Sequence, residues 1–185
     1  MFLLVFLTLA FLPMAFEARL AARHDRALRS VGASEPGDDV FPLMRLAYPA
    51  GFLAMAIEAQ VRGARVNLMW AAGLVVFVLA KAIKYWAIAT LGPRWTFRVL
   101  VPPASSRIMT GPYRFMRHPN YAGVIGELAG MGMMAQAPVS GVLSVAGFVM
   151  LIVARIRVEE RALASTGSAG SGMRGPGAGS STQSS

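Results

Sequence analysis

Residues 68–89 read LMWAAGLVVFVLAKAIKYWAIA, and this stretch decides the fold. It stays apolar for long enough to cross the hydrocarbon core of a bilayer, which takes about 20 helical residues. Lys81 and Lys84 come near its end, where their long side chains are expected to reach the interface beside Tyr85 and Trp86. The stretch predicts a transmembrane helix whose lysines serve only as anchors and tolerate replacement.

The whole chain shares this apolar character. It is 55% hydrophobic and has a mean hydropathy of +0.52, which is too apolar for an ordinary soluble domain of 185 residues. The net charge of +9 would suit nucleic acid, but the basic residues lie between apolar runs, so no nucleic-acid partner is expected. There is no cysteine, and His24 and His118 are the only histidines, so neither disulfides nor a protein-built metal site is expected.

Four more apolar stretches accompany the first, at residues 1–16, 43–59, 122–137 and 139–156. Basic residues follow the N-terminal stretch and none precedes it, which favours a retained helix over a cleaved signal. Only Pro138 and its neighbours separate the last two stretches. We therefore expect an all-α integral membrane protein with about five transmembrane helices, of which the last two form a tight helical hairpin.

The arginines predict the orientation. With the N-terminus outside, most of them would face the cytoplasm, as positively charged loops usually do. That side would carry Arg19 to Arg29, the loop at 90–121, and the group Arg155, Arg157 and Arg161, whereas Arg62 and Arg65 would face outward. We expect a multi-pass protein of a bacterial inner membrane with its functional loop in the cytoplasm.

That loop ends in GPYRFMRHPNY, residues 111–121. Gly111-Pro112 is a turn dipeptide, and Pro119 biases His118 away from helical geometry. Together with Arg114 and Arg117, the shaped backbone suits an anionic or zwitterionic small molecule. The alternative is that these arginines and tyrosines are ordinary interface anchors.

A second polar segment, ARIRVEERAL, covers residues 154–163. On a helix, Arg155 pairs with Glu159 and Arg157 with Glu160, which also fits a salt-bridged helix end. The segment and the loop flank the same hairpin on the same side, so they are expected to meet. Adjacent carboxylates opposite basic side chains could hold a ligand that carries both an amine and a carboxylate.

Glu127 lies within the fourth apolar stretch. A carboxylate inside a membrane is costly and hence a functional candidate, but we favour a position at the wet interface. Ala122, Gly126 and Gly130 form a stripe of small residues that predicts close helix packing. The nearby methionines (Met131, Met133 and Met134) are expected to fill the core or to face a prenyl or acyl chain.

The sequence GPYRFMRHPNYAG, followed by an apolar hairpin and RVEE, resembles the isoprenylcysteine carboxyl methyltransferase family, and its RHPxY and EE elements are shared with phospholipid methyltransferases. The resemblance covers Leu91 to Leu163. It implies an S-adenosylmethionine-dependent membrane enzyme in which residues 1–163 form one domain with a catalytic core at 90–163. The Gly/Ser-rich residues 164–185 are expected to be a disordered tail.

The family's sites carry over to matching positions here. The resemblance implies a cofactor site lined by Tyr113, His118, Pro119, Tyr121, Glu159 and Glu160. It also makes Arg117, Arg155 and Glu160 candidates for catalysis. The lipid tail of a prenylated or other lipid-like substrate would enter sideways between helices.

Three alternatives stay open for the function. The methyl acceptor could be the carboxylate of an isoprenylcysteine-like lipid, a phenolic or polyketide lipid, or the amine of a phospholipid. After EE, family members normally continue with an amphipathic segment, whereas this chain reads ASTGSAGSG from Ala164. A non-catalytic membrane protein that retains the fold is therefore a separate alternative.

Overall fold

A computed structural model describes residues 1–33, 35, 40–98, 100 and 108–171, apart from the side chains of 159 and 162–171. The described chain is helical throughout, which confirms the predicted all-α class. Its elements, in chain order, are α1 (Phe2–Ser30), α2 (Phe41–Arg62), α3 (Leu68–Leu91), the 3-10 helices η1 (Gly92–Arg94) and η2 (Gly111–Arg114), α4 (Pro119–Ala135) and α5 (Pro138–Ser171).

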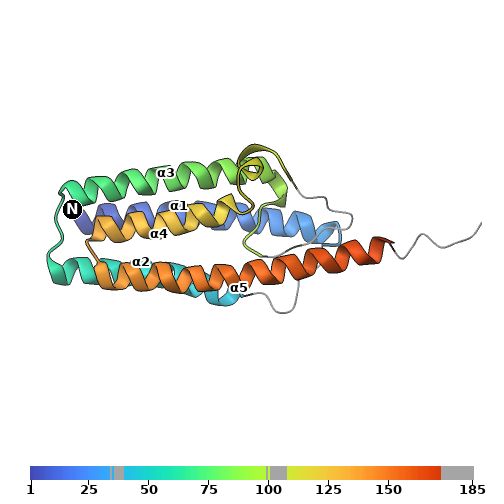
Figure 1. Cartoon of the computed structure of the whole chain (residues 1–185). Coiled ribbons are helices and arrows are strands. Elements are labelled where there is room, and N and C mark those ends of the chain that lie inside the picture. Colours follow the sequence, from blue (N-terminus) through green and yellow to red (C-terminus); the bar gives the residue numbers. More distant parts are fainter. Residues whose placement is uncertain (34, 36–39, 99, 101–107, 172–185) are drawn as a thin grey trace, which may run out of the picture.

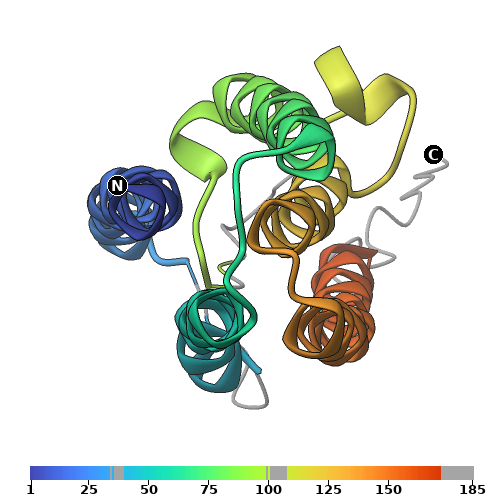
Figure 2. The same ribbon diagram turned by 90° about the vertical axis from the view of Figure 1, so that its left-hand side faces the viewer.

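The five long helices run alternately in opposite directions (Figure 1). The N-terminus, the α2–α3 link and the α4–α5 turn lie at one end of the bundle, and the α3–α4 loop lies at the other. The view along the bundle in Figure 2 shows α4 in the middle and α1 at the edge. Because α4 packs against all four other long helices, the residues at its start are held by the whole bundle.

Local sequence signals set the helix boundaries. The Asn67 side chain caps α3 by accepting a hydrogen bond from the Trp70 amide at 3.0 Å. Gly63 ends α2 in the left-handed conformation. Gln136 adopts the same conformation after α4, and Pro138 then begins α5, so the predicted tight hairpin is confirmed.

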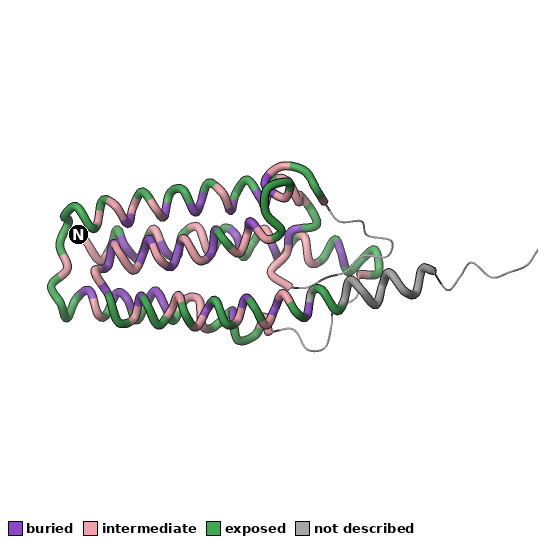
Figure 3. The backbone as a smooth tube through the Cα atoms, viewed as in Figure 1, coloured by how far each residue is buried: buried purple, intermediate pink, exposed green. Residues whose placement is uncertain are grey.

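Within the described residues, three helices are long and apolar enough to cross a membrane: Phe2–Ser30, Leu68–Arg94 and Pro138–Val158. Many of their exposed residues are large and apolar. Figure 3 shows buried and exposed positions alternating along these helices. The chain is therefore a membrane protein.

Two helices are longer than the hydropathy pattern indicated, because a helix continues through polar residues once it has formed. α1 runs to Ser30, and α5 reaches Ser171, within the expected tail; residues 172–185 lie outside the described part.

Glycines let α3 and α4 approach closely. A Cβ atom on Gly130 would lie 2.7 Å from the Phe77 amide nitrogen, and one on Gly126 would lie 2.7 Å from the Ala80 Cβ. Gly123 fits against Lys84 in the same way. The predicted small-residue face is therefore present, but Gly123 takes the place of Ala122, which is exposed.

Four charged side chains form a closed cluster inside the bundle. Glu17 of α1 contacts the ammonium groups of Lys81 and Lys84 of α3 at 2.8 and 2.6 Å, and Glu127 of α4 lies 3.0 and 3.2 Å from the same two groups. The Tyr48 hydroxyl of α2 donates a hydrogen bond to Glu127 Oε2. We call Glu17, Lys81, Lys84 and Glu127 the ion cluster; its net charge is zero when all four are ionised.

The ion cluster corrects two sequence predictions. Lys81 and Lys84 are only 9% and 2% exposed, so neither extends to the interface as an anchor. Glu127 is 1% exposed at the middle of α4, so it does not lie at a wet helix start. The cause is the same in both cases. An opposite charge on another helix compensates the charge of the buried side chain, and the hydropathy of a single segment does not show that such a partner exists.

Replacing Lys84 with Met should destabilise the protein by about 3–5 kcal/mol, because it leaves buried carboxylate charge uncompensated. The matched change Arg62→Met, at an exposed position of α2, should have little effect. Chemical unfolding in detergent micelles measures both. The double variant Glu17→Gln with Lys84→Met should lose less than the sum of its single variants, since it removes one charge of each sign. Equal tolerance of Lys84→Met and Arg62→Met would contradict the ion cluster.

Gly130→Ala should separate α3 from α4, because the added Cβ would meet backbone atoms of Phe77 and Gly73 at 2.7 and 2.8 Å. We expect a loss of roughly 1–3 kcal/mol in the same unfolding assay. Gly147→Ala in α5 is the matched control, since nothing lies within 4 Å of its Cβ position. It should be neutral or slightly stabilising, because alanine has the higher helix propensity.

Candidate functional site

The loop between α3 and α4 has a fixed shape at its described end. Gly111 has φ +56 and begins η2, and a Cβ there would lie 2.4 Å from the Thr90 hydroxyl. Pro112 and Pro119 are buried, and α4 begins at Pro119. His118 has φ −134 and ψ 64, so it precedes the helix in a non-helical conformation, as the following proline predicted. The loop therefore presents its side chains from a backbone that cannot easily rearrange.

His118 and Tyr121 form an aromatic pair at the start of α4. Their rings are stacked, with centroids 5.4 Å apart and an interplanar angle of 21°. The Tyr121 hydroxyl accepts a hydrogen bond from Arg155 Nε of α5 at 3.0 Å. Arg155 also donates to the Phe97 carbonyl, and it is only 5% exposed. Arg155 thus joins α5, α4 and the loop after η1, rather than pointing outward at a salt-bridged helix end.

Arg117 and Glu160 form the second contact between the loop and α5. Arg117 Nη2 lies 3.6 Å from Glu160 Oε1, and the two side chains are 68% and 51% exposed. The loop and the α5 segment therefore meet in space, as expected from their positions on either side of the hairpin. We call Arg117, His118, Tyr121 and Glu160 the motif face.

The remaining site candidates lie in η2 and on α5. Tyr113 is half-buried in η2, and Arg114 is exposed with its guanidinium 5.3 Å from the Phe115 ring centroid. Glu159 lies on α5, but its side chain is outside the described part of the structure. The candidates thus gather at the loop end of the bundle.

The sequence analysis did not predict the residues that attach the α3–α4 loop to α1 and α4. Trp95 is 2% exposed and donates from Nε1 to the Asn120 side chain at 3.2 Å. His24 Nδ1 of α1 lies 2.7 Å from the Trp95 carbonyl oxygen, in hydrogen-bonding contact. A tryptophan in a polar, proline-rich loop and an asparagine inside RHPNY were signals of this contact. Trp95 therefore links the end of α1 to the beginning of α4.

Charged residues also tie the segment after η1 to α1. Arg98 contacts Glu35 at 2.7 Å and Asp25 at 3.6 Å. Burial raises the pKa of the Glu35 carboxyl, but hydrogen bonds from Arg98 and Arg29 outweigh it and hold this pKa below its ordinary value. Glu35 consequently stays ionised at neutral pH and keeps the arginine in place.

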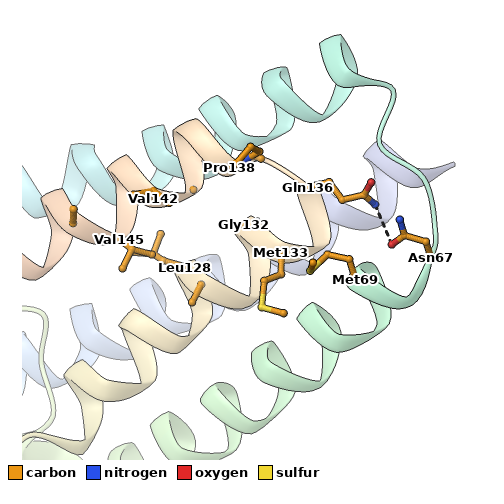
Figure 4. Close-up of a pocket in the computed structure, with 13 residues that line it drawn as sticks. Asn67, Met69, Leu128, Gly132, Met133, Gln136, Pro138, Val142 and Val145 are labelled. Carbon is orange, nitrogen blue, oxygen red and sulfur yellow. Dashed lines mark hydrogen bonds between the residues drawn. The ribbon is translucent and has the colours of Figure 1, made fainter.

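An apolar groove of about 720 Å³ lies toward the opposite end of the bundle, between α4 and α5 (Figure 4). Leu128, Met133, Val142 and Val145 line it, and a hydrogen bond from Gln136 to Asn67 lies at one end. Of the three methionines of α4, Met131 and Met134 are fully buried core residues. Met131 and Met134 thus fill the core as predicted, and Met133 lines this groove instead.

Comparison with known proteins gives the same family as the motif. The model of the isoprenylcysteine carboxyl methyltransferase (ICMT) family matches residues 72–165, which extends the predicted resemblance back into α3. The uncharacterized protein YpbQ of Bacillus subtilis is 30% identical over 149 residues, covering 80% of this chain and 89% of the relative. An uncharacterized protein of Haemophilus influenzae is 27% identical, covering 80% and 87%. No solved structure gives a significant match.

Replacing Arg155 with Met should destabilise the protein by about 1–3 kcal/mol, because the Tyr121 hydroxyl and the Phe97 carbonyl lose their donor. Arg157→Met, two residues further along α5 and exposed, is the matched control and should stay within about 0.5 kcal/mol of wild type. Unfolding in detergent micelles compares them. The role assigned to Arg155 is wrong if the two variants are equally stable.

Proposed function

The chain belongs to the isoprenylcysteine carboxyl methyltransferase family, and on this premise we propose that it is a membrane methyltransferase that binds S-adenosylmethionine at the motif face. The observation that carries the proposal is the meeting of Arg117 and Glu160, two solvent-exposed charges from different elements, beside the stacked pair His118–Tyr121. These groups come from the two sequence elements that make the family recognisable.

The chemistry of the donor set fits the cofactor. S-adenosylmethionine carries an α-amino group, a carboxylate, a sulfonium and an aromatic base. A guanidinium and a carboxylate that face solvent can exchange their mutual contact for the carboxylate and the amine of a ligand at small cost, because exposed ion pairs contribute little by themselves. Aromatic faces such as those of His118 and Tyr121 attract planar or cationic groups.

The described residues divide into groups that bind and groups that position. Arg117 and Glu160 would hold the charged end of the cofactor, with Glu159, Tyr113 and Pro119 proposed around it. Arg155 is buried and engaged with Tyr121 and Phe97, so its proposed part in catalysis is to fix the ring and the loop. When bound, S-adenosylmethionine supplies a methyl group on a sulfonium, which a nucleophile takes by in-line displacement.

We propose a lipid-like acceptor, with the carboxylate of an isoprenylcysteine-like compound first. A carboxylate is already ionised at neutral pH, so the protein only has to orient it, and no proton acceptor is required. A phenolic lipid or a phospholipid amine would also need a group that removes a proton. Glu160 is assigned here to the charged end of the cofactor, so we do not propose it as that base.

The proposed topology has all five long helices in the membrane and the motif face in the cytoplasm of a bacterium. The described arginines of α1, of the α3–α4 loop and of α5 gather at the loop end of the bundle, and Arg62 and Arg65 lie at the other end. This distribution matches the positive-inside tendency. It would place the motif face in the compartment that supplies soluble cofactor.

Calorimetry with S-adenosylmethionine on the detergent-purified full chain tests the proposal. We expect micromolar binding that is lost in His118→Ala and weakened about tenfold or more in Arg117→Gln and in Glu160→Gln, because each loses one charge-assisted contact. Arg157→Gln is the control and should bind like wild type, since this exposed arginine is outside the motif face.

Methyl transfer to lipids then separates the acceptors. Radiolabelled cofactor is offered with a prenylcysteine, a phenolic lipid or an aminophospholipid, and the product that gains label names the class. Wild-type affinity in all three motif-face variants would refute the site assignment. Absence of binding in well-folded protein would support the non-catalytic alternative.

A further inference from the structure

The first helix has an outward face that the rest of the bundle leaves uncovered. At 100° per residue, Leu12, Phe16, Arg19, Arg23 and Arg26 fall within an arc of about 80° on α1. All five are exposed; Leu12 and Phe16 have 67% and 59% of their surface accessible. The buried residues of α1, which include the ion-cluster member Glu17, lie on the opposite side. One face of α1 is thus apolar in its first half and basic in its second.

The length of α1 places the basic half at the level of lipid headgroups. Its 29 residues span about 44 Å, whereas the hydrocarbon core of a bilayer is about 30 Å thick. If the helix enters the core at Phe2, Arg19 lies about 26 Å along it, just inside the far boundary, and Arg23 and Arg26 lie beyond. Arg23 and Arg26 thus lie at the level of the phosphate groups, and the long side chain of Arg19 can extend to it.

A groove continues the apolar half of this face. Leu7, Thr8, Phe11 and Leu12 of α1 and Leu53 of α2 line a shallow, open groove of about 530 Å³. Along the helix, Leu12 and Phe11 are about 10 and 12 Å from Arg19, which is less than the roughly 15 Å of one leaflet's hydrocarbon, whereas Thr8 and Leu7 lie farther away, at about 17 and 18 Å. An acyl chain whose headgroup lies at the arginines can therefore reach the groove.

We propose that α1 binds an anionic phospholipid, with its phosphate at Arg19 and Arg23 and an acyl chain in the α1–α2 groove. Charge complementarity selects the lipid: arginine binds phosphate through paired N–H donors, and a net negative headgroup is favoured over a zwitterionic one. Arg26 adds charge while its Nε also donates to the Ala22 carbonyl at 3.2 Å. The inference does not depend on the proposed methyl transfer, because none of these residues belongs to the motif face.

Native mass spectrometry of the full chain in detergent micelles tests the site. Dioleoyl phosphatidylglycerol and dioleoyl phosphatidylcholine are titrated separately, and the bound fraction of each is measured. We expect one preferentially retained phosphatidylglycerol per chain. Arg19→Gln with Arg23→Gln should weaken that binding about 30-fold, because each basic residue near an anionic headgroup contributes about a factor of five.

The matched control is Arg62→Gln with Arg65→Gln, which removes the same charge from exposed positions at the other end of the bundle. It should leave phosphatidylglycerol binding unchanged. Equal loss in the two double variants would mean that only net charge matters, and would overturn the site. Equal retention of the two lipids by wild-type protein would overturn it as well, without recourse to any variant.

A third arm separates a lipid from a free phosphate. Glycerophosphoglycerol has the headgroup of phosphatidylglycerol but no acyl chains, so it should compete at least tenfold more weakly. Leu53→Trp, which fills the groove from α2, should weaken phosphatidylglycerol while leaving glycerophosphoglycerol unchanged. If the headgroup alone competes as well as the lipid, the arginines are a simple anion site and the groove has no part in it.

Discussion

The rest of the structure depends on the neutralisation of four charges inside the bundle. Glu17, Lys81, Lys84 and Glu127 come from three helices, and each member contacts two of opposite sign within 3.2 Å. In a membrane, an unpaired charge at this depth costs several kcal/mol, so α1, α3 and α4 are stable only in an arrangement that closes the cluster. The hydrogen bond from Tyr48 extends the same requirement to α2. Apolar packing alone is less selective, because lipid tails offer helices a similarly apolar environment.

The ion cluster also helps to position the motif face, because α4 contributes residues to both. Glu127 and the glycines that fit against α3 fix α4 along its length, and the same helix begins with Pro119, Asn120 and Tyr121. Trp95 and Arg155 then attach the loop and α5 to that beginning by hydrogen bonds. The exposed groups Arg117 and Glu160 therefore lie next to residues that are buried and hydrogen-bonded to other helices. A binding face that must act in the same geometry each time gains from such support.

Sequence alone predicted the parts of this structure that depend on one segment at a time. Long apolar stretches predicted helices, Pro138 predicted the hairpin, and Pro119 predicted the non-helical His118. It failed where a residue's environment is set by a partner far away in the chain. Lys84 was read as an anchor and Glu127 as an interface residue because neither stretch reveals the opposite charge on another helix, and nothing within residues 154–163 shows that Arg155 turns inward to Tyr121.

Burial, rather than residue type, separates the arginines by what they can do. Arg155 is held by the Tyr121 hydroxyl and the Phe97 carbonyl, so its donors serve the protein's own structure. Arg117 forms a solvent-exposed ion pair with Glu160. Such a pair contributes little free energy, so contacts to a ligand can replace it. Arg19 and Arg23 lie on an uncovered helix face, beyond which the surroundings are lipid and water. An excess of positive charge that the sequence shows only as an orientation signal would, under the two proposals above, serve separate purposes, and the packing of the helices distinguishes them.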